Sequence, residues 1–166
     1  QIYASDEGFG HLVRQHAGME QLRVQVPDMS VTLQTHRNLS MAKRLYHDVE
    51  FIDRFNNITW SRQTNGTPDL AKIRATYSDY VRRSDDFLLS EEELGIYDFV
   101  VSDFVYEAFP AAARQRVPAF GVAHFTWDWF FSKLYPIPVS TTVLWRWHTF
   151  AQAVDMLLFP SCTANI

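Results

Sequence analysis

The sequence predicts an α/β fold, a Rossmann-like doubly wound parallel sheet with helices on both faces. Strand-like and helix-like segments alternate along the chain, which is typical of a parallel sheet covered by helices. The 166 residues, 47% of them hydrophobic, suffice for one domain with a real core. A Gly-x-Gly-His turn at residues 8–11 follows the first short strand, where sheets of this class bind ligands. We expect a single domain over residues 1–166.

The first third of the chain is predicted to contain three strands and two helices. Short apolar or β-branched segments predict strands at Ile2–Ser5, Met29–Thr35 and Val49–Ile52, and a helix at Leu39–Tyr46 joins the last two. Another helix follows residue 8, since apolar side chains recur there at helical spacing, at Leu12, Val13, Ala17, Met19 and Leu22. Its polar side is expected to hold Arg14, Gln15, Glu20 and Gln21.

The rest of the chain continues the alternation. Turn-forming residues predict a loop over Thr59–Pro68, and a long helix should follow. Apolar runs predict strands at Ile96–Ser102 and Ala119–Ala123, with a helix between them over Tyr106–Gln115. Further helices are expected beyond Trp129 and over Thr142–Asp155, before a last strand at Met156–Phe159.

Composition argues against several classes of partner. The formal net charge is −4, and the basic residues are scattered, so no nucleic-acid-binding surface is expected. Cys162 is the only cysteine, which rules out an intrachain disulfide framework and fits a reducing compartment. Neither a signal peptide nor an apolar run long enough to span a bilayer is present. We expect a cytoplasmic location and no transmembrane segment, with peripheral attachment to the membrane left open.

A histidine and an aspartate follow two strands that should be neighbours. In a sheet of order 3-2-1-4-5 the first and fourth strands lie side by side, so His11 and Asp103 should share one crevice. A carboxylate bonded to one imidazole nitrogen fixes the tautomer and stabilises the imidazolium, which makes the pair a candidate general base. Alternatively, His11 bonds only a backbone group and Asp103 is a turn or N-cap residue.

Two further groups are candidates for substrate binding. Gly8 and Gly10 precede His11 and allow a tight turn with close backbone approach. An aromatic-rich segment follows the fifth strand and could line an acceptor pocket, with His124, Thr126, Trp127 and Asp128 nearest the strand. Alternatively, this segment forms an amphipathic helix that packs on the sheet. No metal site is expected, because His36 and His47 are isolated from other ligands.

Three stretches together resemble the amino-terminal half of GT-B glycosyltransferases: GFGHLVRQHAGMEQLR, YDFVVSDFVYEAFPAAARQRVPAFGV and HFTWDWFF. The chain is similar to predicted transferases of the cell-wall N-acetylglucosaminyltransferase type. The resemblance implies inverting transfer of a sugar from a UDP-linked nucleotide-sugar donor to an acceptor hydroxyl. It also implies His11 as the base, Asp103 as its partner, and no metal or other cofactor.

The resemblance also implies a missing half. GT-B enzymes have a carboxy-terminal domain that binds the nucleotide sugar, and its motifs do not occur in this sequence. A further domain or a partner subunit would have to supply it, and a small-molecule or lipid-linked acceptor would bind the present half. Two alternatives stay open: a non-catalytic sugar- or partner-binding domain, such as one fused to a sugar kinase, and half of a sugar-nucleotide epimerase.

Overall fold

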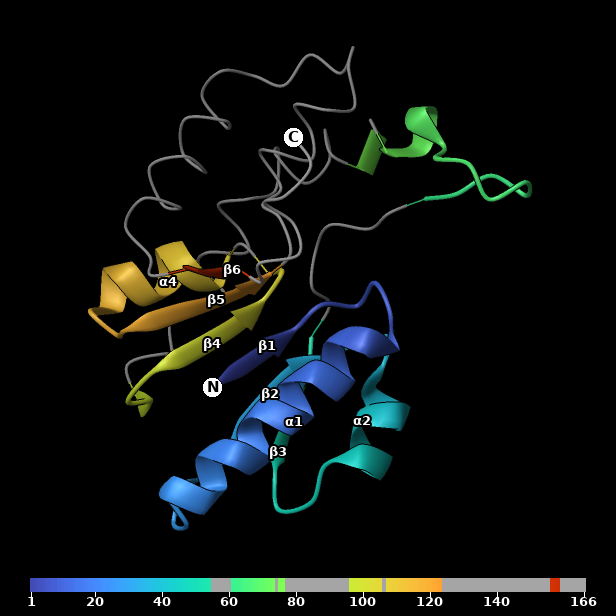
Figure 1. The fold of residues 1–166 in the computed structure, drawn as a ribbon. Helices are drawn as coiled ribbons and strands as arrows, with labels where there is room; N and C mark the ends of the chain where they lie inside the picture. Colours follow the sequence, from blue (N-terminus) through green and yellow to red (C-terminus); the bar gives the residue numbers. More distant parts are fainter. Residues whose placement is uncertain (55–60, 74, 77–95, 106, 124–155, 159–166) are drawn as a thin grey trace.

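A computed structural model of the chain has a six-stranded parallel sheet with helices on both faces (Figure 1). It describes residues 1–54, 61–73, 75–76, 96–105, 107–123 and 156–158. The strands are β1 (Ile2–Ala4), β2 (Thr32–Thr35), β3 (Glu50–Asp53), β4 (Val100–Asp103), β5 (Ala119–Ala123) and β6 (Met156–Leu158). The helices with defined bounds are α1 (Phe9–Gln25), α2 (Leu39–Leu45) and α4 (Ala108–Gln115).

The strand order is β3-β2-β1-β4-β5-β6, which confirms the predicted order for the first five strands and adds β6 beside β5. The order reverses at β1, which pairs with β2 on one side and with β4 on the other. Ala4 lies opposite Asp103, and the Ser5 N–H donates to the Asp103 carbonyl at 3.1 Å. The carboxyl ends of β1 and β4 therefore meet at the position where doubly wound sheets bind ligands.

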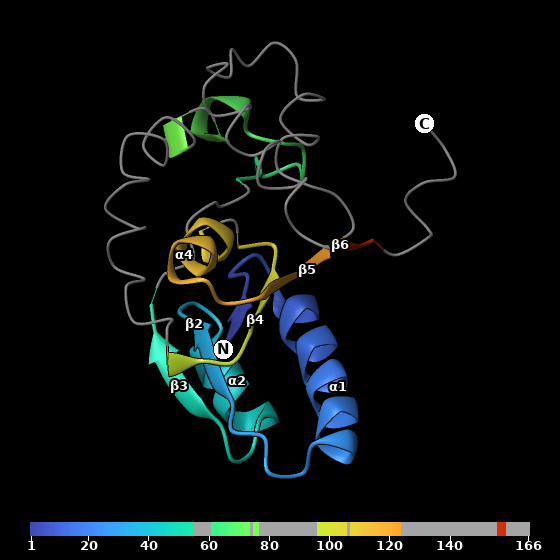
Figure 2. The ribbon, with the colours of Figure 1, turned by 90° about the vertical axis from the view of Figure 1, so that its left-hand side faces the viewer.

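The two faces of the sheet form separate cores. Because side chains alternate along a strand, Ile2 and Ala4 pack on the face covered by α1 and α2, while Tyr3 packs on the face covered by α4. Leu12 and Met19 of α1 join the first core. The strands lie between α1 and α4 (Figure 2), so the prediction of helices on both faces is confirmed.

The predicted buried side of α1 was partly wrong. Val13 and Leu22 are 56% and 40% exposed, whereas Gln15 is only 5% exposed. Leu12, Gln15 and Met19 form the buried side, at spacings of three and four residues. Gln15 can be buried there because its amide donates a hydrogen bond to the buried carboxylate of Asp103.

Most element boundaries agree with the predictions to within one residue, and those of β5 agree fully. The fourth strand begins at Val100, well after the predicted Ile96, whose side chain is 79% exposed. Helical backbone at residues 70–73 and 75–76 fits the helix expected after Pro68. The helices predicted beyond Trp129 and over Thr142–Asp155 lie outside the described residues. Among the residues that the structure describes, no helix is long and apolar enough to cross a membrane.

Candidate functional site

The candidate site begins where β1 passes into α1. Ser5 and Asp6 are buried at the end of the strand, and α1 starts at Phe9, so His11 lies in the first turn of the helix. Asp103 is the last residue of β4, the neighbour of β1 in the sheet. The reversal of strand order therefore brings together residues that are 92 positions apart.

His11 and Asp103 are in hydrogen-bond contact. The imidazole Nδ1 lies 2.7 Å from Asp103 Oδ1, so the expected meeting of the two side chains is observed. The Asp103 side chain is 0% exposed, whereas that of His11 is 21% exposed. Since an ionised carboxylate only accepts hydrogen bonds, this contact requires a proton on Nδ1, and in a neutral ring the lone pair is then on Nε2. Such a pair can act as a general base.

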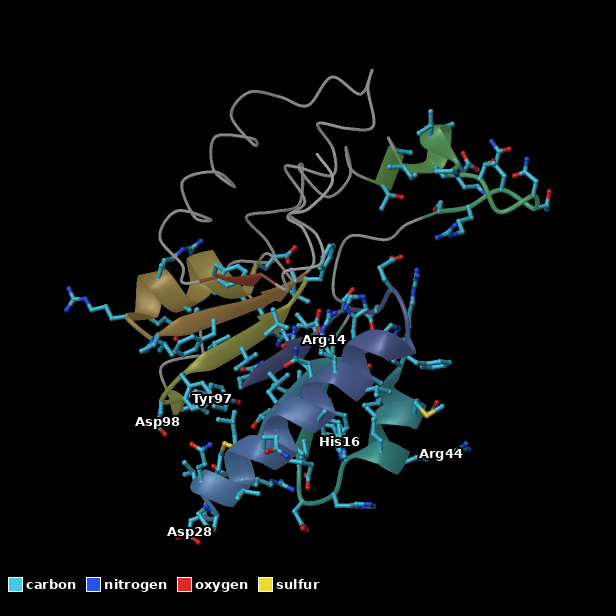
Figure 3. All side chains as sticks on the ribbon, in the orientation of Figure 1. Arg14, His16, Asp28, Arg44, Tyr97 and Asp98 are labelled. Carbon is cyan, nitrogen blue, oxygen red and sulfur yellow. The ribbon has the colours of Figure 1, made fainter. Side chains whose placement is uncertain are left out.

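Arg14 and Gln15 complete the bonding of Asp103. Arg14 Nη2 donates to Oδ1 at 2.5 Å, and Arg14 Nε donates to Oδ2 at 3.0 Å. Gln15 Nε2 donates to Oδ2 at 3.0 Å. Together with His11, these donors give each carboxylate oxygen two partners. Arg14 projects from α1 beside the sheet, whereas His16 lies on the side of the helix nearer α2 (Figure 3).

Arg14 and Gln15 were not predicted as site residues, because helical spacing placed both on the polar side of the helix. One signal was available in their spacing. Residues three and four positions after His11 lie on the same side of a helix as His11 and one turn further along. A donor at either position can therefore reach the carboxylate that bonds His11.

The bonding of Asp103 determines its charge state. Burial alone would raise the pKa of the Asp103 carboxyl, but hydrogen bonds from His11 and Arg14, the electrostatic interaction with His11 and the bond from Gln15 lower it. The net result is a pKa below the ordinary value, so Asp103 is ionised at neutral pH. A permanently negative, fully buried group thus lies beside the imidazole.

Phe104 shapes the other side of His11. Its backbone is left-handed, with φ at 68°, an outlier for a bulky residue. The turn is held by Ser102, whose hydroxyl donates to the Val105 carbonyl at 2.5 Å and accepts from the Val105 N–H at 3.2 Å. The ring centroids of Phe104 and His11 are 5.8 Å apart, so the phenyl group restricts the position of the imidazole. The sequence analysis did not identify this residue.

Asp6 fixes the loop before α1 to the end of β2. Its Oδ1 accepts hydrogen bonds from the Thr35 hydroxyl at 3.0 Å and from the backbone N–H groups of His36 and Arg37, each at 2.9 Å. Asp6 is 5% exposed. This buried carboxylate joins two neighbouring loops at the carboxyl edge of the sheet, and the sequence analysis did not single it out.

The two candidate glycines lie beside open space. Gly8 precedes α1 in an extended conformation that any residue can adopt, and Gly10 lies in the first turn of the helix. A Cβ atom on either would meet nothing within 4 Å. No neighbouring protein atom therefore excludes a side chain at either position. Their role in substrate binding stays a prediction.

The remaining candidates are the substrate-binding residues after β5 and the possible metal ligands. His124, Thr126, Trp127 and Asp128 lie outside the described residues. Within the described ranges, no group of three or more His, Cys, Asp or Glu residues could hold a metal ion. His36 bonds Asp53 at 2.7 Å, but both side chains are more than half exposed, which is typical of a surface pair.

The fold is similar to that of known glycosyltransferase structures. The parallel sheet of order 3-2-1-4-5 with helices on both faces is Rossmann-like and matches one half of the GT-B glycosyltransferases. Among solved structures, CalG4, the calicheamicin glycosyltransferase, superposes with a TM-score of 0.52 at 18% identity, over 90% of this chain. The chain spans 42% of the length of that protein.

A plant structure, Phytolacca americana UGT2 complexed with UDP-2fluoro-glucose and pterostilbene, gives a TM-score of 0.42 at 17% identity. The match includes 80% of this chain and 33% of the plant protein. No protein-family model and no curated protein sequence matches the chain. At 18% identity, the likeness to CalG4 is one of fold.

Proposed function

We propose that this chain is the acceptor-binding half, and the half that bears the base, of an inverting glycosyltransferase. The observation that carries the proposal is the contact of His11 with the buried Asp103 at 2.7 Å, at the reversal of strand order in a sheet of the GT-B type. A second domain, or a partner subunit, supplies the nucleotide sugar. The donor nucleotide expected from the sequence resemblance is UDP.

The proposed reaction is a single displacement at the anomeric carbon of the donor sugar. The acceptor hydroxyl oxygen forms the new bond to that carbon while its proton passes to Nε2 of His11. The bond from the anomeric carbon to the phosphate oxygen breaks, and the nucleotide leaves with the electron pair. Asp103 stabilises the resulting imidazolium through its bond to Nδ1. Attack opposite the leaving group inverts the anomeric centre.

The acceptor is proposed to bind along the carboxyl edge of the sheet. The backbone of Gly8 and Gly10 would contact the acceptor directly, because neither residue has a side chain. The open space beside both residues fits this contact. His124, Thr126, Trp127 and Asp128 are proposed to line the other side, because β5, which they follow in the sequence, ends at the same edge of the sheet. His11, at 21% exposure, is accessible to a bound hydroxyl.

The test is replacement of His11 in the complete transferase. His11→Ala should lower kcat by about 100-fold or more, because general-base catalysis contributes roughly that much, while the affinity for the donor changes little. His16→Gln is the matched control, since His16 belongs to the same helix but contacts the Tyr46 ring and Glu20 instead of Asp103.

Sugar transfer by both variants should be followed with a donor whose released nucleotide is measured. Undiminished transfer by His11→Ala would remove the base from this half of the protein. The non-catalytic sugar- or partner-binding domain would then be the better account.

A further inference from the structure

Arg14 bonds both oxygens of Asp103 and also lies against His11. Its Nε and Nη2 atoms take Oδ2 and Oδ1 of the carboxylate, and Nη2 is 3.2 Å from the imidazole Nδ1. A guanidinium only donates, and so does Nδ1 when it bonds the carboxylate, so the contact at 3.2 Å brings two donors together. Arg14 therefore interacts with the aspartate and opposes extra positive charge on the histidine.

A buried carboxylate needs a positive partner. The Asp103 side chain is 0% exposed, and an ionised carboxyl without a counter-charge is very unfavourable in such a place. Two side chains could supply the charge, the guanidinium of Arg14 or the imidazole of His11. If His11 supplied it, both ring nitrogens would carry protons and the ring could not accept another. The identity of the counter-ion thus decides whether a base is present.

We propose that Arg14 is the permanent counter-ion of Asp103 and so keeps His11 neutral and able to accept a proton. This inference rests on the proposed role of His11 as base, and it makes Arg14 a positioning residue. The guanidinium stays charged at all relevant pH values, so the resting group of His11, Asp103 and Arg14 has no net charge.

The surroundings of His11 support this assignment. Charged groups reach the ring from α1, through Arg14, and from β4, through Asp103. Phe104 contributes an uncharged ring after β4. In the loop after β1, Asp6 bonds instead to Thr35 and to backbone N–H groups after β2. Gln15 provides a built-in comparison, since it donates to Asp103 Oδ2 without carrying charge.

The test compares Arg14→Gln, which keeps a donor and removes the charge, with Arg14→Lys, which keeps the charge and loses the planar fork. Arg23→Gln is the control, because Arg23 belongs to the same helix but donates to the backbone carbonyls of His47 and Asp48. The first readout is the ¹⁵N NMR spectrum of the His11 ring at pH 7, assigned by its loss in His11→Gln.

In the unaltered protein and in Arg14→Lys and Arg23→Gln, the spectrum should show Nδ1 protonated and Nε2 unprotonated. In Arg14→Gln, both nitrogens should be protonated. Correspondingly, the acidic limb of the pH profile of kcat/KM in the complete transferase should move to higher pH by about one to three units in Arg14→Gln, the usual effect of one nearby charge.

Two results would overturn the inference. One is a neutral His11 ring in Arg14→Gln. The other is an imidazolium at pH 7 in the unaltered protein, which requires no variant and so remains decisive if Arg14→Gln fails to fold. The NMR result does not depend on turnover. Full activity of His11→Ala would therefore contradict the proposed function alone, and a neutral ring in an Arg14→Gln protein would contradict the role of Arg14 alone.

Discussion

At the level of single residues, the buried carboxyl of Asp103 links the stability of the protein to pH. Burial opposes ionisation of this carboxyl, but the hydrogen bonds from His11, Arg14 and Gln15 and the electrostatic interaction with His11 together lower its pKa in the folded state. A group with a lowered folded-state pKa stabilises the fold above its unfolded-state pKa, about 3.9 for aspartate. That stabilisation is lost as the pH falls below this value towards the folded-state pKa.

Asp103→Asn should therefore be less stable than the unaltered protein at pH 7, and the difference should shrink as the pH falls below about 4. The free energy of unfolding in urea, measured between pH 2 and pH 7, checks this. Asp53→Asn is the control, since Asp53 also ends a strand at this edge but is 58% exposed. A difference that stays constant over this range would contradict the linkage.

The same variant tests the chemistry. An asparagine can present its amide NH₂ to Nδ1, which favours the tautomer with the proton on Nε2 and so removes the accepting lone pair. In the complete transferase, Asp103→Asn should lower kcat by about 100-fold or more while the KM for the donor changes little. A variant with ordinary kcat would show that the pair is structural.

At the level of elements, helix α1 combines two kinds of residue on one side. Leu12 and Met19 pack in the core, while Arg14 and Gln15 bond Asp103. The periodicity of apolar residues predicts the helix but cannot identify a buried glutamine, because Gln15 is buried only through a partner 88 positions away. The sequence therefore predicted the helix and its neighbouring strands, but it did not predict how Asp103 is bonded.

The order of the strands, in contrast, was predictable from the sequence. Alternation of strands and helices limits the topology to a few choices, and the adjacency of β1 and β4 then follows. That adjacency led to His11 and Asp103. The left-handed backbone of Phe104 could not be foreseen, because bulky residues rarely adopt it and the turn in which it lies is closed by bonds between Ser102 and Val105.

The glycines of α1 provide a test of binding at the start of the helix. Gly10 and Gly18 both lie in α1, and a Cβ on either meets nothing within 4 Å. Alanine at each position should keep the fold, and Gly18→Ala should raise the free energy of unfolding by about 0.5–1 kcal/mol, because glycine disfavours a helix interior. The gain at Gly10 should be no larger, since it lies in the first turn.

Their effects on transfer should differ. If the acceptor approaches the start of α1, Gly10→Ala should raise the KM for the acceptor severalfold, whereas Gly18→Ala, two turns further along, should leave it unchanged. Acceptor titrations in the complete transferase, together with thermal unfolding of both variants, make the comparison. Equal KM values for the two variants would remove Gly10 from the binding surface.

At the level of the whole molecule, the chain has the fold of one half of a two-domain class of enzymes and spans 42% of the length of CalG4. We expect residues 1–166 alone to show no transfer, because the nucleotide sugar is proposed to bind elsewhere. Calorimetry with UDP-glucose and UDP-N-acetylglucosamine should detect no binding to this chain. Measurable affinity for either would place a donor site here and overturn the proposed division of roles.

The distance in sequence between Asp103 and its partners has a consequence for how the protein becomes functional during synthesis. His11, Arg14 and Gln15 leave the ribosome about 90 residues before the carboxylate that bonds them. Until β4 is made and pairs with β1, α1 carries an arginine and a glutamine with no acceptor at Asp103, and the histidine has no oriented partner. Because a domain folds largely as a unit, a chain halted before residue 103 lacks both the complete sheet and the bond that orients His11. The side chains of His11, Arg14 and Gln15 thus gain their shared partner only when the second half of the sheet is made.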